Sequence, residues 1–134
     1  SFIQKISGFL WGIAEGLKSV QKVENKPLFW LYSLGIWICY VGTIVVGFQI
    51  VDGLADLGVG AAFYISVAAA LGFVVPVPGG IGAYHYLVSK ALTVLGYTPD
   101  LGIAFATIIH SGQSLMFITT GAIGMGILYF ARKK

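Results

Sequence analysis

The stretch Pro76-Val77-Pro78-Gly79-Gly80-Ile81-Gly82-Ala83-Tyr84-His85 interrupts an otherwise apolar part of the chain. Its prolines lack the backbone N–H group that a helix needs, and its glycines adopt backbone angles that other residues avoid. A helix that enters from either side must therefore end here and leave peptide groups without partners. Within a membrane, such backbone is tolerated only where it is buried in protein or lines a water-filled cavity. Interrupted apolar helices of this kind mark transport sites, so this stretch is the first candidate for function.

The composition is that of an integral membrane protein. Of 134 residues, 57% are hydrophobic and 10% are charged, which lies outside the usual range of water-soluble domains. At about 20 residues for each crossing, the chain is long enough for only a few crossings. Because it starts with Ser1 and shows no signal peptide, we expect a piece of a longer protein that packs against a missing N-terminal half. The net charge of +3 is concentrated at the two ends, which indicates membrane topology and argues against nucleic-acid binding.

Residues 2–22 are predicted to form an amphipathic helix. One face is apolar, and the opposite face carries lysine, glutamate, glutamine and serine. The helix is expected to lie in the cytoplasmic interface of the membrane or to pack on the cytoplasmic end of a bundle. The apolar stripe consists of Phe2, Ile3, Ile6, Phe9, Leu10, Ile13, Leu17 and Val20.

Two long uncharged runs, residues 27–51 and 101–130, are predicted to cross the membrane. The connections 52–58 and 96–100 contain no lysine or arginine, whereas the C-terminus is basic. By the positive-inside rule, both connections lie on the outer side of the cell membrane and the C-terminus lies in the cytoplasm.

The apolar arms 59–75 and 81–95 flank the break at Pro76–Gly80. Both ends of the stretch 59–95 then lie on the outer side, and the break between the arms is the tip of a hairpin that enters and returns by the same face. At about 1.5 Å per residue each arm reaches roughly 25 Å, less than the roughly 30 Å hydrocarbon core. The predicted fold is therefore all-α: a polytopic protein of the inner cell membrane with a re-entrant helical hairpin. Two short full crossings are the alternative.

The second arm of the hairpin is a candidate site for an anion. Free N–H groups at its N-terminus favour a negatively charged group such as phosphate. His85 falls in the first turn of this arm, where it either donates to a phosphate oxygen or satisfies a neighbouring carbonyl. The last helix adds a polar face, which either hydrogen-bonds to another helix or lines a path for a lipid headgroup. That face carries Thr107, His110, Ser111 and Ser114, with Gln113 to one side. The predicted substrate-binding residues are Pro78, Gly79, Gly80, Gly82, Tyr84, His85, His110, Gln113 and Ser114.

The chemistry of an enzyme or a metal site is not indicated. No acidic residue lies inside a predicted membrane segment, and the chain's two histidines lack a carboxylate or cysteine partner. We therefore expect no catalytic residue, no metal and no cofactor.

The Pro-x-Pro-Gly-Gly-x-Gly core at Pro76–Gly82, with the segments around it, resembles the C-terminal half of the lysylphosphatidylglycerol synthase transmembrane (flippase-like) family. The resemblance covers nearly the whole chain. It implies a polytopic protein that moves aminoacylated phosphatidylglycerol, or in some relatives another lipid, between leaflets. Many members of the family continue with Arg-Glu where this chain has Tyr84 and His85, and this departure leaves the substrate class open. The soluble aminoacyl-transferring domain of some members is absent, so the resemblance implies a transporter part.

Three functions are consistent with these sequence features. The first is a lipid translocase that binds an anionic or aminoacylated phospholipid, or a related lipid, by its headgroup at the tip of the broken hairpin. The second is a structural or interaction subunit of a membrane complex, in which the broken hairpin only seats a partner helix. The third is an enzyme that uses His85 and His110 as an acid/base pair, which requires the two rings to approach to roughly 3 Å or to share one water.

Overall fold

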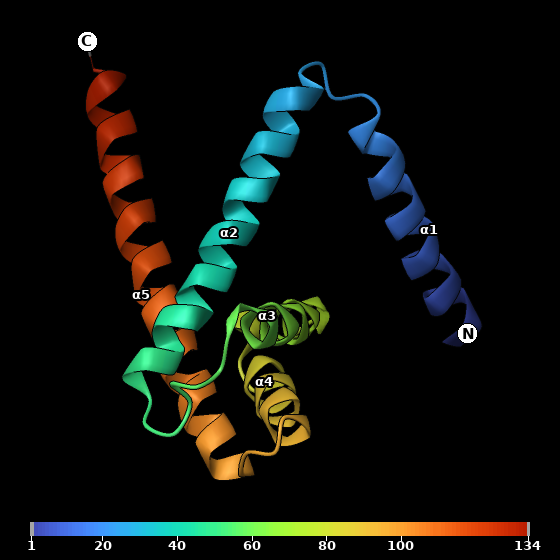
Figure 1. Ribbon diagram of the computed structural model, residues 1–134. Coiled ribbons are helices and arrows are strands. Elements are labelled where there is room, and N and C mark those ends of the chain that lie inside the picture. Colours follow the sequence, from blue (N-terminus) through green and yellow to red (C-terminus); the bar gives the residue numbers. More distant parts are fainter. Residues whose placement is uncertain (1, 134) are drawn as a thin grey trace. The chain divides into compact units, whose positions relative to one another are not determined.

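The fold is all-α, as predicted (Figure 1). A computed structural model describes residues 2–133, except for the side chains at positions 2, 3, 5, 6 and 10, and shows no strand among them. The helices are α1 (Phe2–Val20), α2 (Lys26–Ile50), α3 (Val59–Val74), α4 (Ala83–Val94) and α5 (Pro99–Ala131), with a short 3-10 turn, η1, at Pro78–Gly80.

Contacts divide the chain into two compact units, residues 1–38 and 39–134. In the first unit, α1 is slightly shorter than the predicted 2–22, and Phe9, Trp11 and Leu17 on it are exposed. The side chains predicted for the start of its apolar stripe, Phe2, Ile3, Ile6 and Leu10, lie outside the described residues. The second unit contains the broken hairpin and every residue of the candidate site.

Two helices, α2 and α5, are long and apolar enough to cross a membrane. They contain 25 and 33 residues, which corresponds to about 37 and 50 Å at 1.5 Å per residue. The last helix begins at Pro99 and not at the predicted position 101, because Thr98 caps it through a 3.4 Å hydrogen bond from the Leu101 N–H. Proline at the first position of a helix gives up only a donor that would be unpaired there.

The predicted break in the hairpin is present, and it is wider than Pro76–Gly80. Helix α3 ends at Val74 because Val75 is extended, as expected for a residue before proline. Gly79, Gly80 and Gly82 have φ angles of 63°, 70° and 87°, which favour glycine. Helix α4 therefore begins at Ala83, and the predicted arms 59–75 and 81–95 shorten to Val59–Val74 and Ala83–Val94.

Helix α4 packs between α3 and α5, and a glycine permits close approach on each side. A Cβ atom added at Gly72 would lie 2.7 Å from the Cα of Tyr84, and one added at Gly102 would lie 2.7 Å from the Cα of Ser89. Ser89 also donates a 2.9 Å hydrogen bond to the carbonyl of Pro99. These contacts fix the start of α4 against α3 and its middle against α5.

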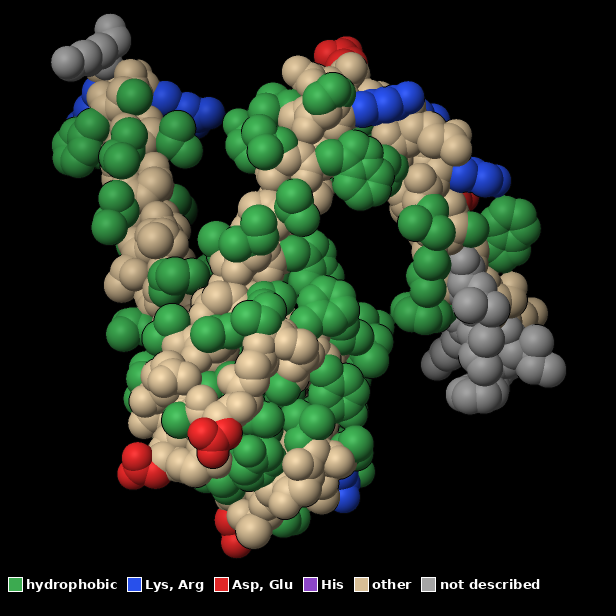
Figure 2. Space-filling model, in the orientation of Figure 1, with side chains coloured by type: hydrophobic (Ala, Val, Ile, Leu, Met, Phe, Trp, Pro, Cys, Tyr) green, Lys and Arg blue, Asp and Glu red, His purple; other side chains and the backbone are tan. Residues whose placement is uncertain are grey.

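The second half of α2 completes this packed region. The Phe48 ring stacks on Phe105 of α5 with 5.4 Å between ring centroids, and Gly47 lies against the side chain of Ile109. The connections from α2 to α3 and from α4 to α5 lie at the same end of the unit, whereas α3 runs across the direction of α5 (Figure 1). Acidic side chains gather at that end, beyond a surface rich in hydrophobic side chains (Figure 2). The hairpin thus has one polar, acidic end and an apolar surround.

Candidate functional site

The site is a cluster of four rings where α3, α4 and α5 meet. The centroid of the His110 ring lies 4.7 Å from that of Tyr84, 5.1 Å from that of His85 and 5.8 Å from that of Phe73. Phe73 in turn lies 5.3 Å from Tyr84. The last turn of α3, the first turn of α4 and the middle of α5 therefore each contribute to one aromatic cluster.

Three polar atoms in this cluster are buried without a hydrogen-bond partner in the described chain. They are the hydroxyl oxygen of Tyr84 and the Nδ1 atoms of His85 and His110. Tyr84 is 1% exposed and His110 is 9% exposed. A buried polar group without a partner costs about 1–3 kcal/mol, so these three groups set the cluster apart from an ordinary packed core.

Backbone donors lie next to these side chains. Helix α4 begins at Ala83, and no side chain caps it through a hydrogen bond. The N–H groups of the first helical residues, which include Tyr84 and His85, have no carbonyl one turn earlier to bind. The aligned peptide dipoles of α4 add a partial positive charge at this point. The start of α4 is therefore a group of donors beside the two imidazoles.

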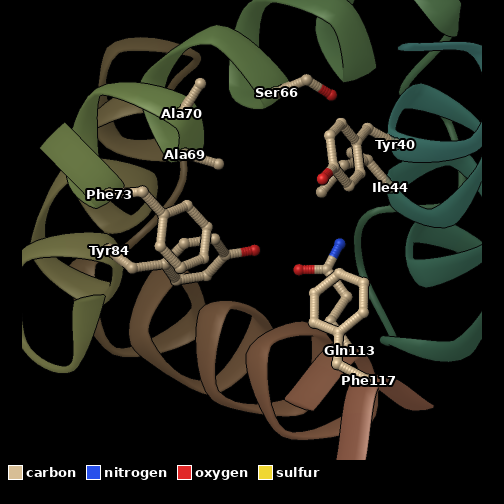
Figure 3. Close-up of a pocket in the computed structure, with 9 residues that line it drawn as sticks. All are labelled: Tyr40, Ile44, Ser66, Ala69, Ala70, Phe73, Tyr84, Gln113 and Phe117. Carbon is tan, nitrogen blue, oxygen red and sulfur yellow. The ribbon is translucent and has the colours of Figure 1, made fainter. Parts of the chain in front are cut away.

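A cavity of about 360 Å³ lies on the other side of Tyr84 (Figure 3). Its wall is mostly apolar, and helices α2, α3, α4 and α5 all contribute to it. In Figure 3 the hydroxyl of Tyr84 points toward the side chain of Gln113. The lining residues are Tyr40, Ile44, Ser66, Ala69, Ala70, Phe73, Tyr84, Gln113 and Phe117.

The structure brings four of the predicted substrate-binding residues together. Tyr84, His85 and His110 form the ring cluster, and Gln113 shares the cavity with Tyr84. The approach of His85 to His110 connects the two separate parts of the prediction, the hairpin tip and the polar face of the last helix.

The other predicted residues are not part of the ring cluster, although Gly80 lies against one of its rings. Pro78, Gly79 and Gly82 are exposed, and Ser114 is half-buried outside the cavity wall. Gly80 is buried, and a Cβ atom added there would lie 2.8 Å from the Phe73 ring. Because Gly79 and Gly80 belong to η1, their N–H groups are not among the first-turn donors of α4.

The polar face predicted on the last helix is divided. His110 is buried, whereas Thr107 is exposed and donates a 2.8 Å hydrogen bond to the carbonyl of Ile103 in its own helix. Ser111 is exposed as well. A threonine that satisfies its hydroxyl within its own helix needs no partner on another helix. The Thr107 hydroxyl is therefore no evidence that this side of α5 lines a path for a lipid headgroup.

Sequence reasoning missed the cavity residues that come from other helices. Phe73, near the end of α3, touches both His110 and Tyr84. Ser66, on α3, also lies on the cavity wall, but its hydroxyl already donates a 2.7 Å hydrogen bond to the carbonyl of Ala62. Tyr40 and Phe117 look like ordinary membrane-helix residues in the sequence. In the sequence, the only sign of these cavity residues was the polar Ser66 in an otherwise apolar arm.

Within residues 2–133, no group of three histidine, cysteine, aspartate or glutamate side chains is placed to hold a metal ion. The donors at the site are instead imidazoles, a phenol, an amide and backbone N–H groups. This set suits an anionic or hydrogen-bonding group of an organic molecule.

Comparison with known proteins agrees with the family suggested by the sequence. The sequence model of the lysylphosphatidylglycerol synthase TM region matches residues 2–124. No curated protein and no solved structure gave a significant match. The match extends from the first helix through most of the last one and includes the broken hairpin. The chain is therefore a membrane protein of the lysylphosphatidylglycerol synthase transmembrane family.

Proposed function

We propose that this chain is part of a lipid translocase, which moves an anionic or aminoacylated phospholipid, or a related lipid, between leaflets of the inner cell membrane. The headgroup phosphate binds at the start of α4, beside His85 and His110. The C-terminus lies in the cytoplasm, and the broken hairpin is re-entrant from the outer face. Transport requires no covalent chemistry, so the protein is not an enzyme in this proposal.

One observation carries the proposal: unpaired donors gather where an apolar helix is broken. The Nδ1 atoms of His85 and His110 are buried and unpartnered, and they lie beside the uncapped start of α4. Each imidazole nitrogen that carries a proton can donate to a phosphate oxygen, and a helix N-terminus favours the same charge. A phosphodiester would satisfy all of these groups at once.

The course of the hairpin supports a re-entrant arrangement. Its two connections to α2 and α5 lie at one end of the unit, and α3 runs across α5 (Figure 1). Two short full crossings would instead run along α5. With 16 and 12 residues, the two arms extend only about 24 and 18 Å, less than the roughly 30 Å hydrocarbon core.

The structural-subunit alternative explains the packing but not the unpaired atoms. A hairpin that only seats a partner helix needs small residues at its contacts, which Gly72 and Gly102 provide. It has no use for the Tyr84 hydroxyl and the two histidine Nδ1 atoms that are buried without hydrogen-bond partners. The enzymatic alternative is compatible with the 5.1 Å between the His85 and His110 ring centroids. We prefer transport to catalysis because the ring cluster includes no nucleophile activated by either histidine.

A lipid-movement assay on the full-length protein tests this function. The protein is reconstituted in vesicles with a fluorescent phosphatidylglycerol, and transfer between leaflets is followed by quenching from outside. We expect His85→Ala to slow transfer about tenfold or more, because a hydrogen bond to a charged group contributes about 1.5–3 kcal/mol.

Tyr86→Ala is the matched control. It removes a ring one residue further along α4, and Tyr86 is 61% exposed and outside the cluster. Its transfer rate should stay near that of the unchanged protein. Equal rates for all three proteins would refute the headgroup site, and absence of transfer by the unchanged protein would favour the structural subunit.

A further inference from the structure

The hydroxyl of Tyr84 connects two different environments. The position of Tyr84 in the first turn of α4 places its backbone N–H among the donors at the start of that helix. Its side chain crosses the ring cluster and ends at the wall of the apolar cavity, where Figure 3 shows the hydroxyl directed toward Gln113. The hydroxyl is buried and has no hydrogen-bond partner.

We propose that the cavity binds the acyl chain of a membrane lipid, and that Tyr84 recognises its ester by donating a hydrogen bond to the ester carbonyl. This inference rests on the proposed function and adds a second subsite to it. The phosphate of the lipid lies at the start of α4, and the glycerol backbone leads from there along Tyr84 to the cavity.

The size and chemistry of the cavity fit one apolar chain with a polar group at its mouth. Its volume of about 360 Å³ lies within the range of small-molecule sites, which are mostly apolar with a few polar groups that fix orientation. Ala69, Ala70 and Phe117 offer only carbon atoms to an occupant. This apolar part of the wall can hold a hydrocarbon chain.

The polar groups at the cavity select an acceptor. A phenol can donate its proton as well as accept one, and a ligand that brings an acceptor would take up the proton of the Tyr84 hydroxyl. The amide of Gln113, half-buried on the same wall, can donate to the same oxygen. Every diacyl phospholipid carries an ester carbonyl between its phosphate and its apolar chain. Along Tyr84, the phosphate subsite comes first and the apolar cavity second, so the hydroxyl lies where the ester carbonyl would be.

The test compares two lipids that differ only at this carbonyl. Full-length protein in nanodiscs is titrated with diacyl phosphatidylglycerol and with its dialkyl ether counterpart, and binding is measured by displacement of a fluorescent lipid. We expect the diacyl lipid to bind about three- to tenfold more tightly, the range that one neutral hydrogen bond supplies.

Tyr84→Phe removes only the hydroxyl and should abolish this preference. The control is Tyr86→Phe on the same helix, where the ring is exposed and lies 5.7 Å from the Nζ of Lys90; it should leave the preference unchanged. An ester preference that persists in Tyr84→Phe would overturn the inference, as would equal binding of the two lipids by the unchanged protein.

The same measurement separates this inference from the proposed function. If both lipids bind equally and His85→Ala still weakens them, the headgroup site stands and the ester subsite fails. If neither lipid binds, both fail, and a helix from elsewhere in the longer protein becomes the better candidate for the cavity.

Discussion

The two halves of α5 are both apolar, yet they meet different surroundings. In the first half, Phe105 and Ile109 are 0% and 5% exposed. In the second half, Ile118 and Met125 are 70% and 72% exposed. Hydrophobicity therefore does not determine which half packs within this unit. What differs is the fit to a neighbouring helix, and the cavity lies where the packed half gives way to the exposed half.

Glycines show the difference most clearly. Gly102 in the packed half lies against the backbone of Ser89, whereas a Cβ atom added at Gly121 or Gly124 in the exposed half would meet no neighbour within 4 Å. Small residues let helix backbones approach in a membrane. The first half of α5 uses its glycine for this purpose within the second unit, and the glycines of the second half meet no neighbour there.

The largest difference in stability between the two halves of α5 is expected when their glycines are replaced by alanine. Gly102→Ala should lower the free energy of unfolding by about 1–3 kcal/mol, because the new methyl group would collide with the α4 backbone. Gly121→Ala in the same helix should leave stability unchanged or raise it by up to about 1 kcal/mol, since alanine favours helix. Unfolding in mixed micelles, followed by circular dichroism, measures both. Equal losses for the two variants would show that the exposed half is packed as tightly as the first.

A smaller effect is expected from removing the hydroxyl groups that hydrogen-bond to carbonyls of each half of α5. Ser89→Ala removes the 2.9 Å hydrogen bond that ties α4 to Pro99 at the start of α5, and it should cost about 1 kcal/mol. Thr119→Val removes an exposed hydroxyl that bonds only to carbonyls of its own helix, so it should change stability by less than about 0.5 kcal/mol. The same unfolding experiment compares them, and a larger loss for Thr119→Val would contradict the assignment of α5 contacts.

The break in the hairpin was predictable because proline and glycine act through local backbone geometry. Pro76 and the glycines at 79, 80 and 82 end one helix and delay the next regardless of what packs around them. The start of α5 was missed by two residues because Thr98 and Pro99 form a cap that the apolar run alone does not reveal.

The pairing of His85 with His110 was not predictable in the same way. It depends on how α4 crosses α5, and that crossing is set by the contact of Gly102 with Ser89. The sequence placed each histidine near a functional surface and left open whether they meet. Phe73 was overlooked for the same reason, because its contacts with His110 and Tyr84 exist only once α3 folds back over α4.

The proposed headgroup site requires that water reaches the broken hairpin at membrane depth. In a background where Cys39, the chain's single cysteine, is replaced by alanine, three cysteine variants of the full-length protein are labelled with a membrane-impermeant maleimide. Ala83→Cys probes the start of α4, Gly58→Cys probes the open connection before α3, and Ile123→Cys probes the exposed apolar half of α5.

We expect Ala83→Cys to react more slowly than Gly58→Cys and much faster than Ile123→Cys. An Ala83→Cys variant as unreactive as Ile123→Cys would show that the break is dry, and one as reactive as Gly58→Cys would show an ordinary surface loop. Either result would contradict a wet site inside the membrane.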